Sequence, residues 1–338
     1  MVSSMEQRVA KAVTMTDVLA ARRRIASHVL RSSLTPSMSL SSHTGHPILF
    51  KNEHQQLTGS FKLRGATNAV LSLSSEEQQR GVAAASTGNH GRALSHAALA
   101  TGAKAIICMS SLVPTNKVEA IRALGAEARI VGKSQDDAQR EVDRLVAEDG
   151  LIDIPPFDRA EIIAGQATLG LEIIEDAPEL DAVLVPLSGG GLIAGVALAI
   201  KTVSPKTRII GVSMERGAAM VACLAAGRPI EVDELETLAD SLGGGIGLSN
   251  RYTFGMVRDL VDETILLTER EIAGAIVHAY VHEREVIEGA AAVGIGAILS
   301  GKFLAKGPTA LVLSGRNIDM GVHAQLIAET HPALVGDA

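Results

Sequence analysis

Three consecutive glycines, Gly189, Gly190 and Gly191, follow an apolar run that ends at Leu187 and precede another that begins at Leu192. This order predicts a strand, a tight turn and a helix. Glycines let the backbone approach an anion closely, and the first N–H groups of the helix add the positive end of its dipole. The turn is therefore a candidate phosphate cradle, and a plain tight turn is the alternative.

A second turn joins a predicted strand to a predicted helix through Ser86, Thr87, Gly88, Asn89, His90 and Gly91. One Ser or Asn would be enough to cap the helix. The whole row of polar and glycine positions favours a site for an anion or a carboxylate at the end of the strand. Simple helix capping remains the alternative.

A lysine, Lys62, stands between Gly59 and Gly65 in an otherwise apolar run. An amine attacks an aldehyde only when it is neutral, so such a role requires a lowered pKa. Position alone does not distinguish Lys62 from an ordinary solvated lysine. A third turn that begins at Ser314 indicates, by itself, only a loop.

The glycine turn also fits a relaxed dinucleotide pattern at Gly189, Gly191 and Ala194. Glu215 then lies near the end of the next apolar strand, where a ribose-binding acid would belong. This pattern keeps an NAD-dependent oxidoreductase open as an alternative function. A P-loop is excluded, because Glu127 stands where the pattern before Gly132 requires a glycine.

Short apolar runs alternate with amphipathic stretches from residue 48 onward, which is typical of a doubly wound α/β fold around parallel sheets. Strands are predicted at 82–86, 105–109, 128–131, 182–187, 208–213 and 309–313. Helices are predicted at 91–100, 116–124, 134–148, 192–201, 218–226 and 269–283. The pair Pro155-Pro156 ends a compact block at 81–150 and marks a boundary or hinge.

The composition excludes several classes of protein. The 338 residues carry a net charge of −7, only 2% are aromatic and there is no Trp, which argues against nucleic acid as a partner. The two cysteines, Cys108 and Cys223, are far apart and form no disulfide framework, so a cytoplasmic location is expected. We expect no signal peptide, because the N-terminus has no apolar region of the required kind. We expect no membrane span, because the uncharged stretch 182–200 contains Pro186 and the three glycines.

Three motifs occur together in this order: Ser60-Phe61-Lys62, the turn from Ser86 to Gly91, and Gly189-Gly190-Gly191-Leu192. They resemble the fold-type II enzymes that use pyridoxal 5′-phosphate, in the branch of threonine dehydratases, serine racemases and hydroxyaspartate dehydratases. Within that branch the hydroxyectoine-utilisation dehydratases are the most similar group. The resemblance extends from about residue 15 to 317. It implies a tryptophan synthase β-like fold, two doubly wound α/β domains with the cofactor in the cleft between them. Residues 1–77 and 158–338 would form the large cofactor-binding domain and 78–157 the small one.

The resemblance also implies a role for each matching residue. Lys62 would hold the cofactor as a Schiff base, Phe61 would flank its ring, and Asn89 would bind its 3′-oxygen. The phosphate would lie on Gly189, Gly190, Gly191 and Leu192, and Ser314 would face the pyridine nitrogen. The substrate would meet Ser86, Thr87, Asn89, His90 and the acid Glu288.

Two positions depart from the family pattern. Thr87 carries a hydroxyl where many dehydrating members have Ala and racemases have Ser. It could act as an acid on the face opposite Lys62, or it could only pack or cap. Glu215 matches one carboxylate of the family's divalent-cation site, but its neighbourhood supplies no second. No metal site is therefore expected, with Glu215 as a weak candidate.

The implied reaction is a β-elimination. Lys62 would remove the α-proton of a 3-hydroxy amino acid, the hydroxyl would leave as water, and the product would hydrolyse to a 2-keto acid and ammonia. A neutral serine at position 314 suits elimination better than transamination. The alternatives are a serine or aspartate racemase with side dehydratase activity, and a binding protein without catalysis.

The substrate stays open among threonine, serine, 3-hydroxyaspartate and a hydroxylated diamino acid from hydroxyectoine breakdown. The resemblance implies a homodimer. Few residues follow Ser314, so we expect no C-terminal regulatory domain, no feedback control and a catabolic role.

Overall fold

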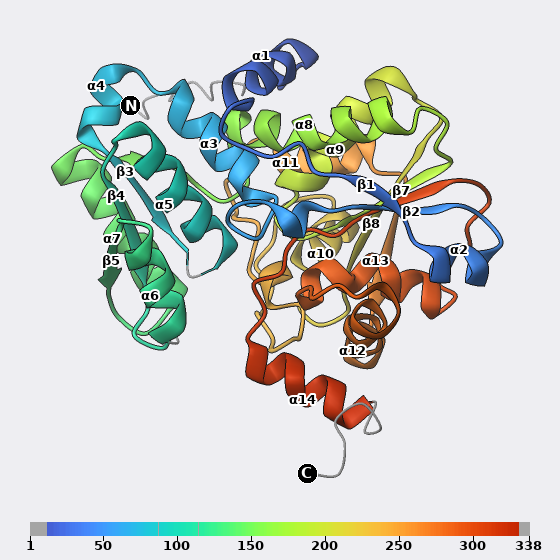
Figure 1. Ribbon diagram of the computed structural model, residues 1–338. Coiled ribbons are helices and arrows are strands. Elements are labelled where there is room, and N and C mark those ends of the chain that lie inside the picture. The colour runs from blue at the N-terminus through green and yellow to red at the C-terminus, as the bar shows by residue number, and fades with distance from the viewer. Residues whose placement is uncertain (1–11, 87, 114, 331–338) are drawn as a thin grey trace.

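The computed structural model describes residues 12–86, 88–113 and 115–330, and it contains two sheets (Figure 1). The larger sheet has the order β1-β2-β10-β7-β8-β9, and all its pairings are parallel except β1 with β2. Its strands are β1 (Leu34–Pro36), β2 (Ile48–Lys51), β7 (Ala182–Pro186), β8 (Arg208–Met214), β9 (Glu263–Leu267) and β10 (Thr309–Val312).

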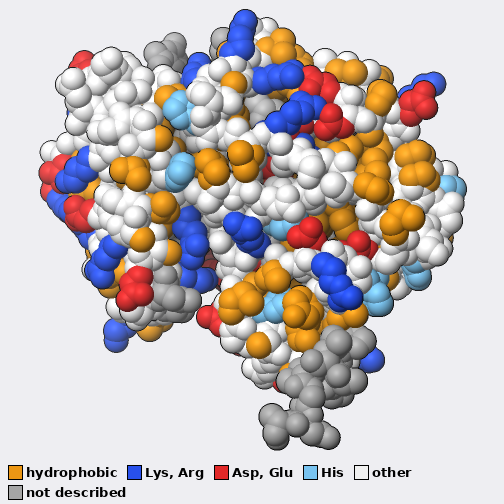
Figure 2. All heavy atoms as spheres, in the orientation of Figure 1, with side chains coloured by type: hydrophobic (Ala, Val, Ile, Leu, Met, Phe, Trp, Pro, Cys, Tyr) orange, Lys and Arg blue, Asp and Glu red, His pale blue; other side chains and the backbone are white. Residues whose placement is uncertain are grey.

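The smaller sheet is parallel throughout and has the order β5-β4-β3-β6. Its strands are β3 (Val82–Ala85), β4 (Ala105–Met109), β5 (Glu127–Ile130) and β6 (Ile152–Asp153). The lobe built on this sheet lies on the left in Figures 1 and 2. The predicted α/β class with parallel sheets is confirmed.

The helices cover both faces of the sheets. Those of the larger lobe are α1 (Met15–Ile25), α2 (Met38–Thr44), α8 (Ala160–Asp176), α9 (Gly191–Val203), α10 (Ala219–Ala226), α11 (Thr253–Leu260), α12 (Glu269–His278), α13 (Gly289–Leu299) and α14 (Met320–Thr330). The smaller lobe has α4 (Ser75–Arg80), α5 (Asn89–Thr101), α6 (Thr115–Ala123) and α7 (Gln135–Asp149), and α3 (Lys62–Ser72) packs on both α5 and α8.

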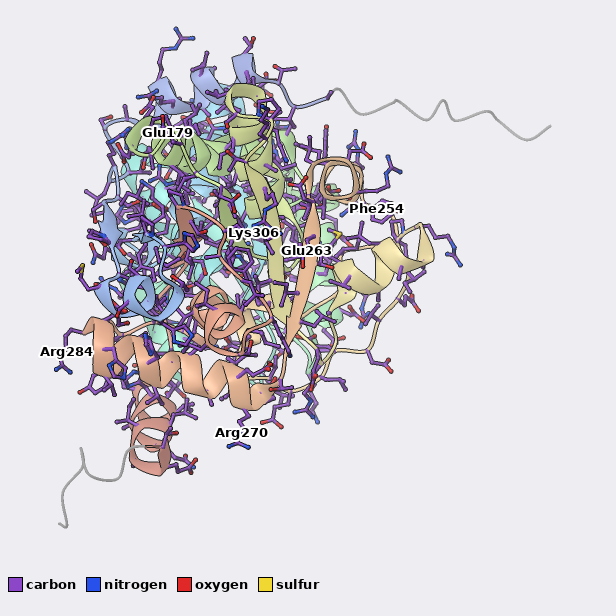
Figure 3. All side chains as sticks on the ribbon, turned by 90° about the vertical axis from the view of Figure 1, so that its right-hand side faces the viewer. Glu179, Phe254, Glu263, Arg270, Arg284 and Lys306 are labelled. Carbon is purple, nitrogen blue, oxygen red and sulfur yellow. The ribbon has the colours of Figure 1, made fainter. Side chains whose placement is uncertain are left out.

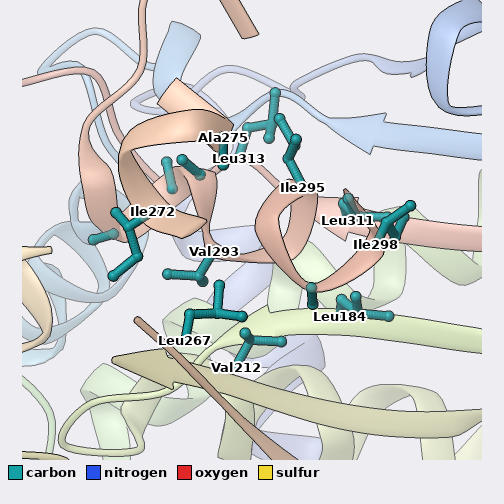
Figure 4. Close-up of a cluster of buried hydrophobic side chains, with 14 of the residues drawn as sticks. Leu184, Val212, Leu267, Ile272, Ala275, Val293, Ile295, Ile298, Leu311 and Leu313 are labelled. Atoms are coloured by element: carbon teal, nitrogen blue, oxygen red, sulfur yellow. The ribbon is translucent and has the colours of Figure 1, made fainter. Parts of the chain in front are cut away.

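Alternating residues of each central strand enter different cores, because successive side chains point to opposite faces of a sheet. In β7, Leu184 packs with α12 and α13, whereas Val183 packs with α8 and α9. Figure 4 shows the first of these cores, in which Leu184 and Val212 of the sheet lie on the side of α13, near Ile298 and Val293 respectively. Both faces are thus buried, as expected for parallel strands connected by helices.

The predicted strands agree with the observed ones to within one residue at either end. One predicted helix is partly wrong: α12 ends at His278, and Ala279–Glu283 continues it as a π-helix. Figure 3 shows this element between Arg270 and Arg284, the latter in a left-handed conformation with φ 63°. Within the described residues no helix is both long and apolar enough to cross a membrane.

Candidate active site

Helix α3 places Lys62 at its first residue, directly after a β-bridge between Ser60 and Gly315. The helix crosses α8 so closely that a Cβ on Gly165 would lie 2.7 Å from the Gly65 Cα. Only glycine fits such a contact between two helix backbones. Lys62 is therefore carried on a helix whose position is set by tight packing.

The first turn of α3 is anchored by ion pairs. Arg64 donates from Nε to Glu53 at 2.8 Å and from Nη1 to Glu172 at 2.7 Å, and both Arg64 and Glu53 are almost fully buried. Lys51 also donates to Glu172 at 2.6 Å. A buried charge is costly unless it is paired, and here each charge has a partner. This network was not predicted from the sequence.

The amine of Lys62 donates a hydrogen bond to the Pro156 carbonyl oxygen at 2.8 Å. Surrounding protein atoms desolvate it and lower its pKa to about 8, although Glu288 acts in the opposite direction. Removal from water disfavours the charged form of a lysine. Lys62 thus has the larger neutral fraction that attack on an aldehyde or acceptance of a proton requires.

The glycine turn forms the N-terminus of α9. Gly190 is the N-cap and has φ +89°, a conformation that favours glycine. A Cβ on Gly189 would lie 2.3 Å from the Phe157 ring, and one on Gly191 would lie 2.9 Å from the Phe157 Cβ. The turn therefore leaves no room for side chains, and the first-turn N–H groups of α9 have no partner inside the helix. This arrangement fits a phosphate group.

A short strap, residues 155–158, links the lysine to this turn. Its Pro156 carbonyl accepts from Lys62, and its Phe157 packs on Gly189. Asp158 then accepts hydrogen bonds from the backbone N–H groups of Tyr252 and Thr253, both at 2.9 Å. The Pro-Pro pair that the sequence marked as a boundary therefore also contributes to the site.

Ser314 follows the end of β10 and contacts Phe61, the residue before Lys62. It is buried, and its carbonyl oxygen accepts from the Phe61 N–H at 3.0 Å. Phe61 in turn lies beside Lys62, whose Nζ is 5.3 Å from the ring centroid. The buried Ser60 hydroxyl, two residues before Lys62, has no hydrogen-bond partner within the described residues. Unpaired buried hydroxyls are costly, so they are suited to a polar ligand.

Asn89 and Glu288 meet across the two lobes. Asn89 Nδ2 donates to Glu288 Oε1 at 2.7 Å, and the Asn317 N–H donates to Glu288 Oε2 at 3.0 Å. Burial raises the pKa of Glu288 to about 7, with a further increase from Asp240, and the hydrogen bonds offset only part of it. A carboxyl group that titrates near neutrality can donate or accept a proton.

Asn317 completes this cluster and was not predicted as a site residue. Its amide donates to Asn89 Oδ1 at 2.5 Å and to the Thr58 carbonyl at 3.0 Å. The turn Ser314-Gly315-Arg316-Asn317 was visible in the sequence, but nothing in it indicated which side chain would face Asn89.

Ser86 and His90 each bond to a backbone group. The Ser86 hydroxyl accepts from the Gly91 N–H at 3.2 Å, as a helix cap would. His90 Nε2 donates to the Ile154 carbonyl at 2.7 Å, and burial together with Lys62 lowers its pKa to about 3, so its ring is neutral. Thr87 lies outside the described residues. Contact of these three with a substrate stays a prediction.

Glu215 lies apart from this cluster. It is exposed, and its N–H donates to the Leu267 carbonyl at 2.9 Å. Nowhere in 12–86, 88–113 or 115–330 do three or more His, Cys, Asp or Glu residues gather as metal ligands. The cation site therefore has no support beyond the single carboxylate.

Known proteins resemble the whole chain. The family model for pyridoxal-phosphate dependent enzymes matches residues 25–315. A protein of Sinorhizobium fredii, whose name assigns it provisionally to the threonine dehydratases, is 60% identical over 316 residues, 93% of this chain and 95% of that protein. The L-threonine ammonia-lyase of Thermotoga maritima is 41% identical over 93% of this chain and 78% of that protein. The structure of maize serine racemase superposes with a TM-score of 0.88 at 32% identity, covering 96% of this chain and all of that one.

Proposed function

Because the chain belongs to the family of pyridoxal-phosphate dependent enzymes, we propose that it is a lyase that eliminates water from a 3-hydroxy amino acid and yields a 2-keto acid and ammonia. The family match confirms the resemblance seen in the sequence, the fold-type II assignment and the cofactor class. The threonine dehydratase relatives favour the lyase over the NAD-dependent oxidoreductase. The observation that carries the proposal is that one strap contacts both parts of the site. Its Pro156 carbonyl accepts a hydrogen bond from the Lys62 amine, and its Phe157 packs on the Gly189–Gly191 turn.

The residues of the site fit pyridoxal phosphate. The N–H groups of Gly189 to Leu192 would hold the phosphate, Lys62 would bind the aldehyde, and the hydroxyl of Ser314 would face the ring nitrogen. When bound, the cofactor supplies an electron sink for the carbanion at the α-carbon. Phe61 would flank the ring, and Asn89 would orient it from the side of Glu288.

The chain's own residues would move the protons. Lys62, whose lowered pKa of about 8 leaves part of the amine neutral, would take the proton from the substrate's α-carbon. The β-hydroxyl would leave with a proton as water, and Glu288, with its pKa of about 7, would be the acid that assists. Ser86, Thr87, Asn89 and His90 would hold the substrate carboxylate at the start of α5. The enamine product then tautomerises and reacts with water to release ammonia.

Racemisation is the second candidate function. The similarity to maize serine racemase supports it, together with the hydroxyl of Thr87 opposite Lys62 in the family pattern. Chiral analysis of residual L-serine would detect D-serine if this activity exists. Thr87→Ala should then abolish D-serine formation while ammonia release continues.

Other features of the proposal derive from the cysteine content, for the location, and from the resemblance. They are a cytoplasmic homodimer, a role in hydroxyectoine utilisation, and a division into 1–77 with 158–338 and 78–157. The two separate sheets support the division, because β3 to β6 all fall within 78–157. A divalent cation is not part of the proposed mechanism.

A direct test uses the purified enzyme with added pyridoxal phosphate. Release of keto acid and ammonia is measured on threonine, serine, 3-hydroxyaspartate and a hydroxylated diamino acid. We expect turnover of at least one, visible absorption from the bound cofactor, and borohydride labelling of Lys62. Lys62→Ala should lose both the turnover and the absorption, whereas exposed Lys104→Ala should keep them. Turnover and absorption that persist in Lys62→Ala would refute the assignment.

A further inference from the structure

Arg92 lies one helical turn after Asn89 on α5, so the two side chains share one face of the helix. Its guanidinium is half-buried, and Nη1 donates to Asn317 Oδ1 at 3.3 Å. Asn317 in turn donates to Asn89, and Asn89 donates to Glu288. Arg92 therefore contacts, through Asn317, the cluster of Asn89, Glu288 and Asn317 that borders the proposed cofactor site.

The charge of Arg92 has no ion-pair partner within the described residues, where no carboxylate oxygen lies within 4.0 Å of it. Burial lowers its pKa, and Glu288 offsets this only from a distance. The almost fully buried Arg64 differs because it is paired with Glu53 and Glu172. A half-buried cation without a partner is costly unless an anion from outside the protein pairs with it.

The helix end adds to this cost. Arg92 lies in the first turn of α5, where the helix dipole places partial positive charge and disfavours a cation. Local stability therefore does not explain an arginine at this position. An anion bound here would be attracted both by the guanidinium and by the end of the helix.

Gly88, the N-cap of α5 and four residues before Arg92, has space around it. A Cβ on Gly88 would meet no atom within 4 Å. Lys and Arg side chains also gather along the boundary between the two lobes on the face drawn in Figure 2. An anionic group would thus approach the site through a region of positive charge.

From these observations we infer that Arg92 determines substrate specificity by binding a second, negatively charged group of the substrate. The preferred substrates are then 3-hydroxy amino acids that carry a carboxylate where threonine carries its methyl group. Guanidinium and carboxylate can form two parallel charge-assisted hydrogen bonds, which a neutral group cannot replace. This inference rests on the proposed dehydratase function and deepens it.

The test compares substrates of similar shape and different charge. Values of kcat/KM are measured for threo-3-hydroxyaspartate, the neutral amide 3-hydroxyasparagine, and threonine, with the holoenzyme and with Arg92→Gln. We expect the holoenzyme to prefer the acid over the amide by about tenfold to a hundredfold, the range of one charge-assisted contact. Arg92→Gln should remove that preference, Arg92→Lys should restore part of it, and exposed Arg316→Gln should retain it.

Binding gives a second readout that does not depend on elimination. L-aspartate and L-asparagine lack the leaving hydroxyl, and their dissociation constants can be measured from the cofactor absorption or, without cofactor, by calorimetry. The ratio of the two constants should favour aspartate and should decrease in Arg92→Gln. An unchanged ratio, or equal kcat/KM for acid and amide, would overturn the inference even if threonine is converted. If no 3-hydroxy amino acid is converted but aspartate still binds through Arg92, the dehydratase proposal fails and the anion site stands.

Discussion

Asn89 and Glu288 form a hydrogen bond of 2.7 Å between elements 199 positions apart in the chain. Asn89 begins α5 of the smaller lobe, and Glu288 is the residue before α13 of the larger lobe. The bond therefore connects the two lobes at the point where the cofactor would lie. It also stabilises the ionised form of Glu288, whose burial acts the other way.

The lowered pKa of Lys62 predicts how fast the protein without cofactor takes up pyridoxal phosphate. Only the neutral amine reacts with an aldehyde, so the rate should increase about tenfold per pH unit below pH 8 and become constant above it. Stopped-flow absorbance of the bound cofactor measures this rate. Because Glu288 raises the pKa of Lys62, Glu288→Gln should move the midpoint to lower pH. A rate that still increases above pH 10 would contradict the lowered pKa.

Glu288 should make the protein without cofactor less stable as the pH rises. In the unfolded chain its carboxyl titrates near 4.5, and in the folded protein near 7, so the folded state binds the proton more tightly. Its contribution is fully present below pH 4.5 and is lost as the pH rises through 7. Relative to Glu288→Gln, the wild-type free energy of unfolding should decrease by roughly 3 kcal/mol between pH 4 and pH 8. The free energy of unfolding of both proteins is measured with urea at each pH. If it changes with pH by the same amount in the wild type and in Glu288→Gln, the raised pKa of Glu288 is ruled out.

Gly189→Ala should weaken cofactor binding. The new methyl group would lie 2.3 Å from the Phe157 ring, so either the strap or the turn must move away. Displacement of the backbone N–H groups should raise the dissociation constant of pyridoxal phosphate by roughly tenfold to a hundredfold, which corresponds to strain of about 1–3 kcal/mol. Fluorescence or absorbance titration measures it. Gly245→Ala is the matched control, since its Cβ would meet nothing within 4 Å.

Arg64→Met should be strongly destabilising, because it leaves two buried carboxylates, Glu53 and Glu172, with fewer cationic partners. Breaking a buried ion pair from one side costs about 3–5 kcal/mol. Arg144→Met is the control: Arg144 also pairs with two carboxylates, Glu141 and Glu148, but on the surface, where the loss should be below about 1 kcal/mol. Urea unfolding compares the two, and losses of equal size would argue that the buried network does not anchor α3.

The sequence by itself determined the parts of this protein that depend on neighbouring residues. Apolar runs identified the central strands, because a parallel strand is buried on both faces. The glycines at 189–191 identified a turn that side chains could not occupy, and the structure shows this at Phe157. The order of three motifs identified the family. For Lys62 the local sequence was insufficient, and the motifs around it carried the prediction.

Only the tertiary structure decided which distant residues meet. Asn317 is not distinguishable from other loop asparagines until the turn after β10 lies against Asn89. In the sequence Arg64 is indistinguishable from an ordinary helix cation. Its pairing with Glu172 is seen only where α8 packs against α3. Arg92 likewise becomes exceptional only because no carboxylate lies near it in the described structure. Burial and pairing of charge depend on contacts between segments far apart in the chain, and such contacts leave no local pattern in the sequence.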